Sequence, residues 1–136
     1  MTWNVVLGDE FESEFERLAE AVQDELLAHM QVLERFGPSL GRPLADTLKG
    51  SRHTNMKELR FRVNGGVWRV AFAFDPRRAA IVLVAGDKSG YSKRWFYRRL
   101  MKVADRRFDR HLLALREPAL REPALKESAL EEKGND

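Results

Sequence analysis

The sequence predicts a single α+β domain, in which a small antiparallel β-sheet is preceded by a helix or helical hairpin and followed by a basic helix. Two observations lead to this fold class. Apolar residues recur at spacings of three and four up to residue 36, alternate with polar residues from residue 56, and return to helical spacing after residue 94. The length of 136 residues and the 43% share of hydrophobic residues fit one domain with a core of ordinary size.

The first 36 residues predict a short strand that leads into helix. Residues 2–7 (TWNVVL) are β-prone and end at Gly8, after which Asp9 stands where a helix N-cap would. The apolar residues that follow have a helical period: Phe11, Phe15, Leu18, Val22, Leu26, Met30, Leu33 and Phe36. This pattern fits one long helix or two helices in a hairpin that breaks near residues 19 to 21, and both remain open. Gly37-Pro38 ends the helix, and residues 38–55 are expected to form an irregular loop.

Residues 56–85 predict three antiparallel strands joined as a meander. Apolar and charged side chains alternate over residues 56–63, as in a strand with one covered face. Asn64-Gly65-Gly66 supplies the positive φ values of a tight hairpin turn, and residues 75–78 (DPRR) indicate a type I turn. Residues 79–85 are apolar on both faces, which is typical of a strand covered on both sides. In the middle strand, alternation places in the core Trp68, Phe72 and Phe74.

Residues 94–115 predict a helix with an apolar stripe and a basic stripe. Spacings of four align five cations along one side of this helix: Arg94, Arg98, Lys102, Arg106 and Arg110. Beyond it, the units LALRE, PALRE, PALKE and SALEE repeat every five residues, a period that matches no helix and that two prolines interrupt. We therefore expect one domain over residues 1–112 and a largely disordered tail over residues 113–136.

The charge of the chain is distributed unevenly. Residues 1–36 hold two basic and nine acidic residues, a net −7, whereas residues 37–112 hold eighteen basic and six acidic residues, a net +12. A basic section of this size indicates a polyanionic partner, most simply a nucleic acid, although a solvated surface would also account for it.

Several classes of protein are poor fits to the sequence. There is no cysteine, and the three histidines lie far apart without a metal-binding motif, so we expect neither a metal nor another cofactor. Phosphate-binding loops and nucleophile elbows are also missing. No signal peptide and no apolar run of membrane-spanning length are evident, and we expect a cytoplasmic protein without membrane contact.

The strand face that carries charge is the candidate site. It presents Glu58, Arg60, Arg62 and Arg69, followed by a loop with Asp87, Lys88, Tyr91 and Lys93. Arg62 and Arg69 flank the hairpin turn at similar distances and are expected to be cross-strand neighbours, whose repulsion a bound phosphate would relieve. The alternative is that Glu58 and Asp87 pair with these arginines as ordinary surface ion pairs.

Three short motifs make the chain recognisable: Glu58-Leu59-Arg60 on one strand, Trp68-Arg69 on the next, and Asp87-Lys88 after the third. Together with the helix that follows, they resemble the RelE/ParE superfamily of bacterial toxins, and within it the HigB-like, phage Gp49-like branch. The resemblance covers roughly residues 1 to 112. It implies a small antiparallel sheet of the RelE type backed by a helical hairpin.

The resemblance also implies a function. A toxin of a type II toxin-antitoxin pair is expected, acting as a metal-independent mRNA endoribonuclease at the ribosome and neutralised by a HigA-like helix-turn-helix antitoxin. In such a reaction the 2′-hydroxyl attacks the adjacent phosphate, which requires a base, an acid and cations for the phosphorane. By motif position, Arg69 corresponds to the phosphate-stabilising arginine of the family, with Arg60 or Arg62 beside it and Lys88 as a further cation.

The acid and the base have no unambiguous position. Catalytic candidates beside the three cations are Glu58, His53 and Tyr91, whereas Tyr97 is expected to pack and His111 to stand at a helix end. Trp95 is expected in the core, although it could stack on a base. RNA contacts are expected from Lys57, Arg62, Lys93, Arg94, Arg98, Lys102 and Arg106. Two rival functions remain: a ParE-like inhibitor that binds DNA gyrase, and an RNA-binding regulator without activity.

Overall fold

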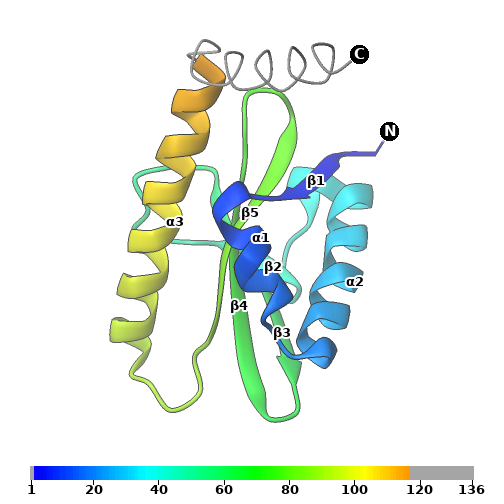
Figure 1. Ribbon diagram of the computed structural model, residues 1–136, viewed down its shortest axis with the longest axis vertical. Helices are drawn as coiled ribbons and strands as arrows, with labels where there is room; N and C mark the ends of the chain where they lie inside the picture. The colour runs from blue at the N-terminus through cyan, green and yellow to red at the C-terminus, as the bar shows by residue number, and fades with distance from the viewer. Residues whose placement is uncertain (1, 117–136) are drawn as a thin grey trace, which may run out of the picture.

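The computed structural model describes residues 2–116, which form a five-stranded sheet with helices on both faces (Figure 1). In chain order the elements are β1 (Asn4–Leu7), α1 (Asp9–Glu16), α2 (Glu20–Phe36), η1 (Gly37–Ser39), β2 (Ala45–Thr47), β3 (Met56–Val63), β4 (Gly66–Phe74), β5 (Ala79–Asp87) and α3 (Lys93–Arg116). The expected α+β class is confirmed. Of the repeat tail, residues 113–116 belong to α3, and residues 117–136 lie outside the described residues.

The sheet is larger than the expected meander. Its strand order is β1-β5-β4-β3-β2, so the antiparallel β3-β4-β5 meander forms the centre, as predicted. At one edge β1 pairs with β5 in parallel, which makes the sheet mixed. At the other edge β2 lies within the segment that the sequence predicted to be an irregular loop. The prediction missed β2 because a three-residue strand between glycines and prolines shows no alternation to detect.

The N-terminal helices form the hairpin rather than one long helix. The break falls at residues 17–19, where Ala19 is extended with ψ 144°. Gln23 stabilises the break, because its side-chain amide donates to the carbonyl oxygens of Phe15 (2.7 Å) and Glu16 (3.2 Å) at the end of α1. Gly8, and not Asp9, is the N-cap of α1.

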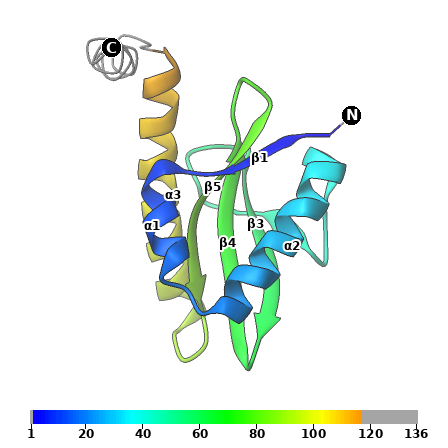
Figure 2. The same cartoon turned by 45° about the vertical axis from the view of Figure 1, so that its right-hand side comes forward.

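Two apolar cores lie on the two faces of the sheet. Helices α1 and α2 cover one face, and α3 covers the other (Figures 1 and 2). Alternating residues of β4 and β5 supply both cores, so β5 is covered on both sides as predicted. The first core is formed by Phe11, Leu26, Leu33, Val70, Phe72 and Val82, and the second by Met56, Ala71, Ile81, Leu83, Leu100 and Phe108.

The β3-β4 turn has the predicted geometry, with φ of 47° at Asn64 and 83° at Gly65. In the turn after β4, the Asp75 carboxylate accepts the backbone N–H groups of Arg77 (2.9 Å) and Ala79 (3.0 Å).

None of the helices among residues 2–116 has the length and apolar character that crossing a membrane requires.

Candidate functional site

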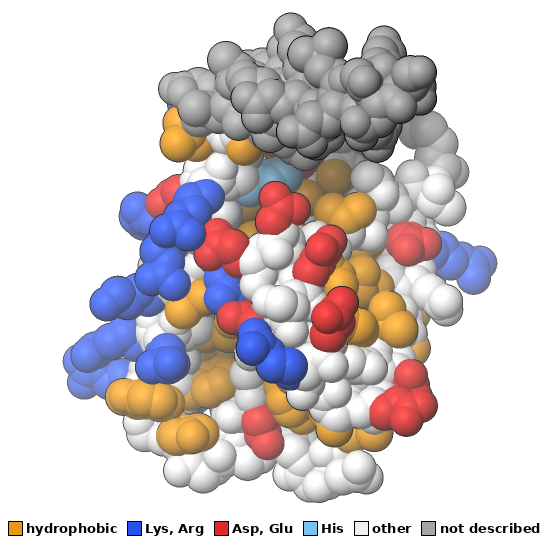
Figure 3. All heavy atoms as spheres, viewed as in Figure 1, with side chains coloured by type: hydrophobic (Ala, Val, Ile, Leu, Met, Phe, Trp, Pro, Cys, Tyr) orange, Lys and Arg blue, Asp and Glu red, His pale blue; other side chains and the backbone are white. Residues whose placement is uncertain are grey.

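A cationic groove opens between the β2-β3 edge of the sheet and the N-terminal half of α3. Its volume is about 860 Å³, and it lies on the α3 side of the sheet. Figure 3 shows lysine and arginine side chains gathered along α3. The charged residues that line the groove are Arg42, Asp46, Lys49, Glu58, Arg60, Lys88, Lys93, Arg94, Arg98 and Lys102. Cations therefore outnumber carboxylates by eight to two, which favours a polyanionic ligand.

Beneath the groove, three side chains from three elements form one hydrogen-bonded cluster. The Tyr97 hydroxyl of α3 donates to Glu58 Oε1 of β3 at 2.8 Å and accepts from Arg69 Nε of β4 at 3.1 Å. Arg69 Nε and Glu58 Oε1 are 3.7 Å apart. The second Arg69 donor is occupied as well, because Nη1 donates to the Trp68 carbonyl oxygen at 2.9 Å.

Burial determines the protonation behaviour of this cluster. It raises the pKa of Glu58, although the Tyr97 hydrogen bond and the Arg69 charge act in the opposite direction. The pKa of Tyr97 is also raised, first by burial and then by its bond to Glu58. Glu58 is thus a carboxyl group at a groove floor with strengthened basicity, a property that general bases share.

Arg69 is one of the predicted catalytic residues, and its side chain is only 7% exposed. It lies beneath Glu58 and Tyr97, outside the set of residues that line the groove. Its charge lowers the pKa of Glu58 within the cluster and that of Lys88 in the groove.

Arg60 is the cation of β3 that lines the groove. Its side chain is 32% exposed, and its Nη1 lies 3.9 Å from Asp46 Oδ2, which Arg42 Nε also contacts at 2.9 Å. The ladder pairs Arg60 with Arg69 and Arg62 with Val67. The expected Arg62–Arg69 neighbour pair was therefore wrong. The turn contains only Asn64 and Gly65, so Arg62 is opposite Val67, and Arg69 lies two residues further along β4.

Lys88 directly follows β5 and lines the groove together with residues of β3 and α3. Burial lowers the pKa of the Lys88 ammonium, and the charges of Arg69, Arg60 and Lys93 lower it further. Its backbone N–H donates to the Val67 carbonyl oxygen at 2.9 Å, which extends the β4-β5 ladder and fixes its position. Asp87, expected as a partner for the arginines, instead accepts the N–H groups of Val67 and Ser89.

The basic row of α3 is divided between two surroundings. Arg94, Arg98 and Lys102 line the groove together with Lys93. Further along the helix, Arg110 pairs with Glu10 of α1 at 3.1 Å. Of the other expected RNA contacts, Arg62 is exposed on the strand face beyond the groove lining, Arg106 is exposed on α3, and Lys57 donates to the Pro38 carbonyl oxygen at 3.3 Å.

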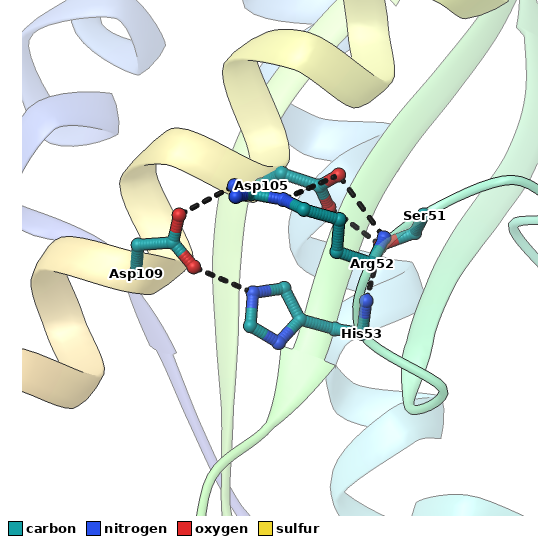
Figure 4. A network of polar contacts seen from close by, with 5 residues as sticks. All are labelled: Ser51, Arg52, His53, Asp105 and Asp109. Carbon is teal, nitrogen blue, oxygen red and sulfur yellow. Dashed lines mark hydrogen bonds and ion pairs between the residues drawn. The ribbon is translucent and has the colours of Figure 1, made fainter.

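A network of polar contacts ties the loop after β2 to α3 (Figure 4). The buried Asp105 carboxylate accepts the Ser51 hydroxyl at 2.5 Å and the Arg52 backbone N–H at 3.2 Å. One turn later, Asp109 contacts both Arg52 and His53, the latter at 2.8 Å. We call these five residues the latch. Because Leu48, Lys49 and Gly50 of the same loop line the groove, the latch joins its two walls.

Among the predicted catalytic residues, Glu58, Arg60 and Lys88 line the groove. The His53 ring contacts the Asp109 carboxylate in the latch. Tyr91 is 58% exposed and stacks on Trp95. His111 pairs with Asp75 at 2.8 Å. Tyr97, expected only to pack, contributes its hydroxyl to the site. Its position two turns before the buried Ala104 was the available signal, since it lies between the core stripe and the basic stripe of α3.

Within the described residues, no group of three or more His, Cys, Asp or Glu side chains could hold a metal ion.

A model of the family described as phage-derived protein Gp49-like (DUF891) matches residues 13–109. Two relatives come from Mycobacterium tuberculosis (strain ATCC 25618 / H37Rv). The candidate toxin HigB2 is 50% identical over 88 residues, 64% of this chain and 43% of HigB2. The candidate toxin HigB3 is 41% identical over 108 residues, 79% of this chain and 92% of HigB3.

A solved structure shares the fold. A double-substitution mutant of the E. coli toxin RelE, in the free state, superposes with a TM-score of 0.52 over 74% of this chain and 95% of RelE. The sequences are 11% identical, so this likeness concerns the fold alone. The expected RelE-like architecture is confirmed, whereas the chain spans less than half the length of HigB2.

Proposed function

This chain belongs to the phage-derived Gp49-like family, with HigB-like toxins of the RelE fold as its relatives, and from that premise we propose that it is a toxin that cleaves RNA. The observation that carries the proposal is Glu58, a buried carboxyl group of raised pKa on the floor of a groove lined by cations. RNA supplies both features that this site fits, a polyanionic backbone and a 2′-hydroxyl for a base to deprotonate.

The reaction is an internal transesterification. Glu58 takes the proton of the 2′-hydroxyl, whose oxygen bonds to the adjacent phosphorus while the bond from phosphorus to the 5′-oxygen breaks. Lys88 delivers a proton to that 5′-oxygen, and its lowered pKa suits a donor. The products are a 2′,3′-cyclic phosphate and a 5′-hydroxyl. The chain's own side chains perform each of these steps.

The remaining groups position and stabilise. Arg60 reaches the groove surface and faces the negative charge that develops on the phosphorane. Tyr97 holds Glu58 in place through its hydroxyl, and Arg69, buried behind both, keeps the carboxylate charged and oriented. Arg69 is therefore a positioning residue in this scheme, which revises the role that motif position implied.

Partners follow from the same proposal. An mRNA held on a translating ribosome would be the substrate, and a HigA-like helix-turn-helix antitoxin the neutralising partner. The acidic helices α1 and α2 lie on the opposite face of the sheet from the groove, so a partner could bind there without entering the site. Cytoplasmic location belongs to this proposal too.

The test is cleavage of a defined mRNA, free and on translating ribosomes, in the presence of a metal chelator. Wild-type protein should leave 2′,3′-cyclic phosphate ends, and a 2′-O-methyl group at the cut site should block the reaction. Glu58→Gln and Arg60→Gln should each lower the rate about 100- to 1000-fold. Glu34→Gln on α2, remote from the groove, serves as the matched control.

Cleavage that persists in Glu58→Gln would overturn the assignment of the base. Absence of cleavage on both substrates, with inhibition of DNA gyrase supercoiling by both wild type and Glu58→Gln, would replace the proposal with the binding mechanism of a ParE-like inhibitor.

A further inference from the structure

An exposed aromatic pair stands beside the groove, at the start of α3. Tyr91 and Trp95 stack with ring centroids 4.8 Å apart and planes inclined by 23°. They remain 58% and 48% exposed. The sequence predicted Trp95 in the core and Tyr91 among the catalytic residues. The structure instead places the two rings together on the surface.

A helix-stabilising role does not account for this pair. Ser92 caps α3, because its hydroxyl accepts the Trp95 backbone N–H at 3.2 Å. A hydrophobic contact at a helix start normally buries its members. Here Phe96, the next residue, already anchors the start of the helix in the core at 6% exposure. Two further aromatic rings add exposed apolar surface and no core.

A cation and a small hollow lie next to the pair. The Arg99 guanidinium lies 5.8 Å from the Trp95 ring centroid. A hollow of about 190 Å³ is bounded by the pair, by the end of β5 and by α3, with Gly86 at its strand side. Asp87 is the carboxylate at its edge, and backbone N–H groups of Val67 and Ser89 occupy one of its oxygens.

The hollow and the groove lie on the two sides of the N-terminal half of α3 and share no lining residue. The loop after β5 supplies Lys88 to the groove and Tyr91 to the hollow, and the first turn of α3 supplies Arg94 to the groove and Trp95 to the hollow. Trp95 and Arg98 are three residues apart and therefore neighbours on the helix surface, so an RNA strand whose phosphates contact Arg94 and Arg98 would reach the aromatic pair by crossing the exposed side of α3.

We propose that the hollow against the Tyr91–Trp95 pair binds one unpaired base of the RNA by stacking, next to the nucleotides held in the groove. This inference rests on the proposed function and extends its substrate to single-stranded RNA with a splayed base. Aromatic rings flanked by cations are the arrangement by which proteins hold unpaired bases.

The experiment measures binding of a fluorescent single-stranded oligoribonucleotide whose sugars are all 2′-O-methylated. Such RNA lacks the nucleophile, so the result is independent of cleavage. The full chain is compared with Trp95→Ala, Tyr91→Ala and Trp95→Phe, and with Phe36→Ala as the matched control. Phe36 lies on α2 and is exposed to the same extent, 49%. An abasic oligomer with the same phosphates is measured in parallel.

Trp95→Ala and Tyr91→Ala should raise the Kd for the RNA about ten- to hundredfold, while Trp95→Phe keeps most of the affinity. The abasic oligomer should bind wild type weakly and respond little to either substitution. Equal losses on both oligomers, or losses no larger than that of Phe36→Ala, would refute base stacking. Unchanged RNA binding with impaired antitoxin binding would assign the pair to a protein interface. Failure of the nuclease proposal would be seen separately, with Glu58→Gln on cleavable RNA.

Discussion

Arg69 and Glu58 lie diagonally across the β3-β4 ladder with their side chains each 7% exposed, and their nearest charged atoms lie 3.7 Å apart. The pair is shielded from water beneath the groove and linked through the Tyr97 hydroxyl. Each buried charge is therefore neutralised mainly by the other, in place of the water that would solvate it at the surface. Buried pairs of this kind respond far more to loss of one partner than to replacement of both.

Removing Arg69 alone should destabilise the protein. Arg69→Met leaves the Glu58 carboxylate buried without its cation, at a cost of about 3–5 kcal/mol in the free energy of unfolding. The double variant Arg69→Met/Glu58→Gln should recover a substantial part of this loss. Urea unfolding of the four members of this cycle gives the coupling energy. Arg62→Met, exposed on the same strand face, is the control and should stay within about 0.5 kcal/mol of wild type. Additive effects in the cycle would show that Arg69 and Glu58 are energetically independent.

Cleavage should have a bell-shaped dependence on pH. The acid limb reports deprotonation of Glu58, and burial places it above the ordinary glutamate pKa of 4.5. The alkaline limb reports loss of the Lys88 proton, and burial with neighbouring cations places it below the ordinary lysine pKa of 10.5. Values of kcat/KM against pH on a short RNA measure both limbs. In Lys88→Arg the alkaline limb should move upward and the maximal rate fall. An acid limb that persists in Glu58→Gln would identify another base.

Separating Ser51 from Asp105 should loosen the groove. Ser51→Ala removes a hydrogen bond to a buried carboxylate, and we expect a loss of about 1–3 kcal/mol in the free energy of unfolding, together with weaker RNA binding, because the loop forms one wall of the groove. Ser39→Ala removes an exposed bond to the Phe36 carbonyl oxygen and is the control. Chemical denaturation and Kd measurements test both effects. If Ser51→Ala loses stability while RNA binding stays at the wild-type value, the latch has no part in shaping the groove.

The sequence predicted those parts of the fold and site that depend on local periodicity. Alternation along residues 56–63 and 67–75 placed Glu58, Arg60 and Arg69 on one face, and the ladder confirms it. The row of basic residues spaced by four on α3 and the Asn64-Gly65 turn were also predicted, because each depends only on residues close together in the sequence. Arg62 was paired with the wrong residue because counting distances from a turn requires its exact length.

Other parts depend on contacts distant in sequence. The burial of Arg69 depends on Tyr97, 28 residues later, and the engagement of His53 depends on Asp109, 56 residues later. No spacing rule connects residues that far apart. The hairpin of α1 and α2 lacks glycine and proline at its break, because a side-chain amide from α2 satisfies the carbonyl groups there.

The basic row of α3 should divide into cations that bind RNA and cations that do not. Arg94 and Arg98 line the groove, whereas Arg110 is engaged by Glu10. The slope of log K against log salt falls by about 0.7 for each single-strand phosphate that the protein no longer neutralises. The double variant Arg94→Gln/Arg98→Gln should therefore flatten the slope by about 1.4 on 2′-O-methyl RNA, while Arg110→Gln, with the same chemical change on the same helix, should leave it unaltered. Binding measured over a range of salt concentrations gives both slopes. Equal slopes for wild type, the double variant and Arg110→Gln would show that the RNA phosphates do not contact Arg94 and Arg98. If Arg110→Gln flattens the slope as much as the double variant does, the whole basic row acts as one electrostatic surface.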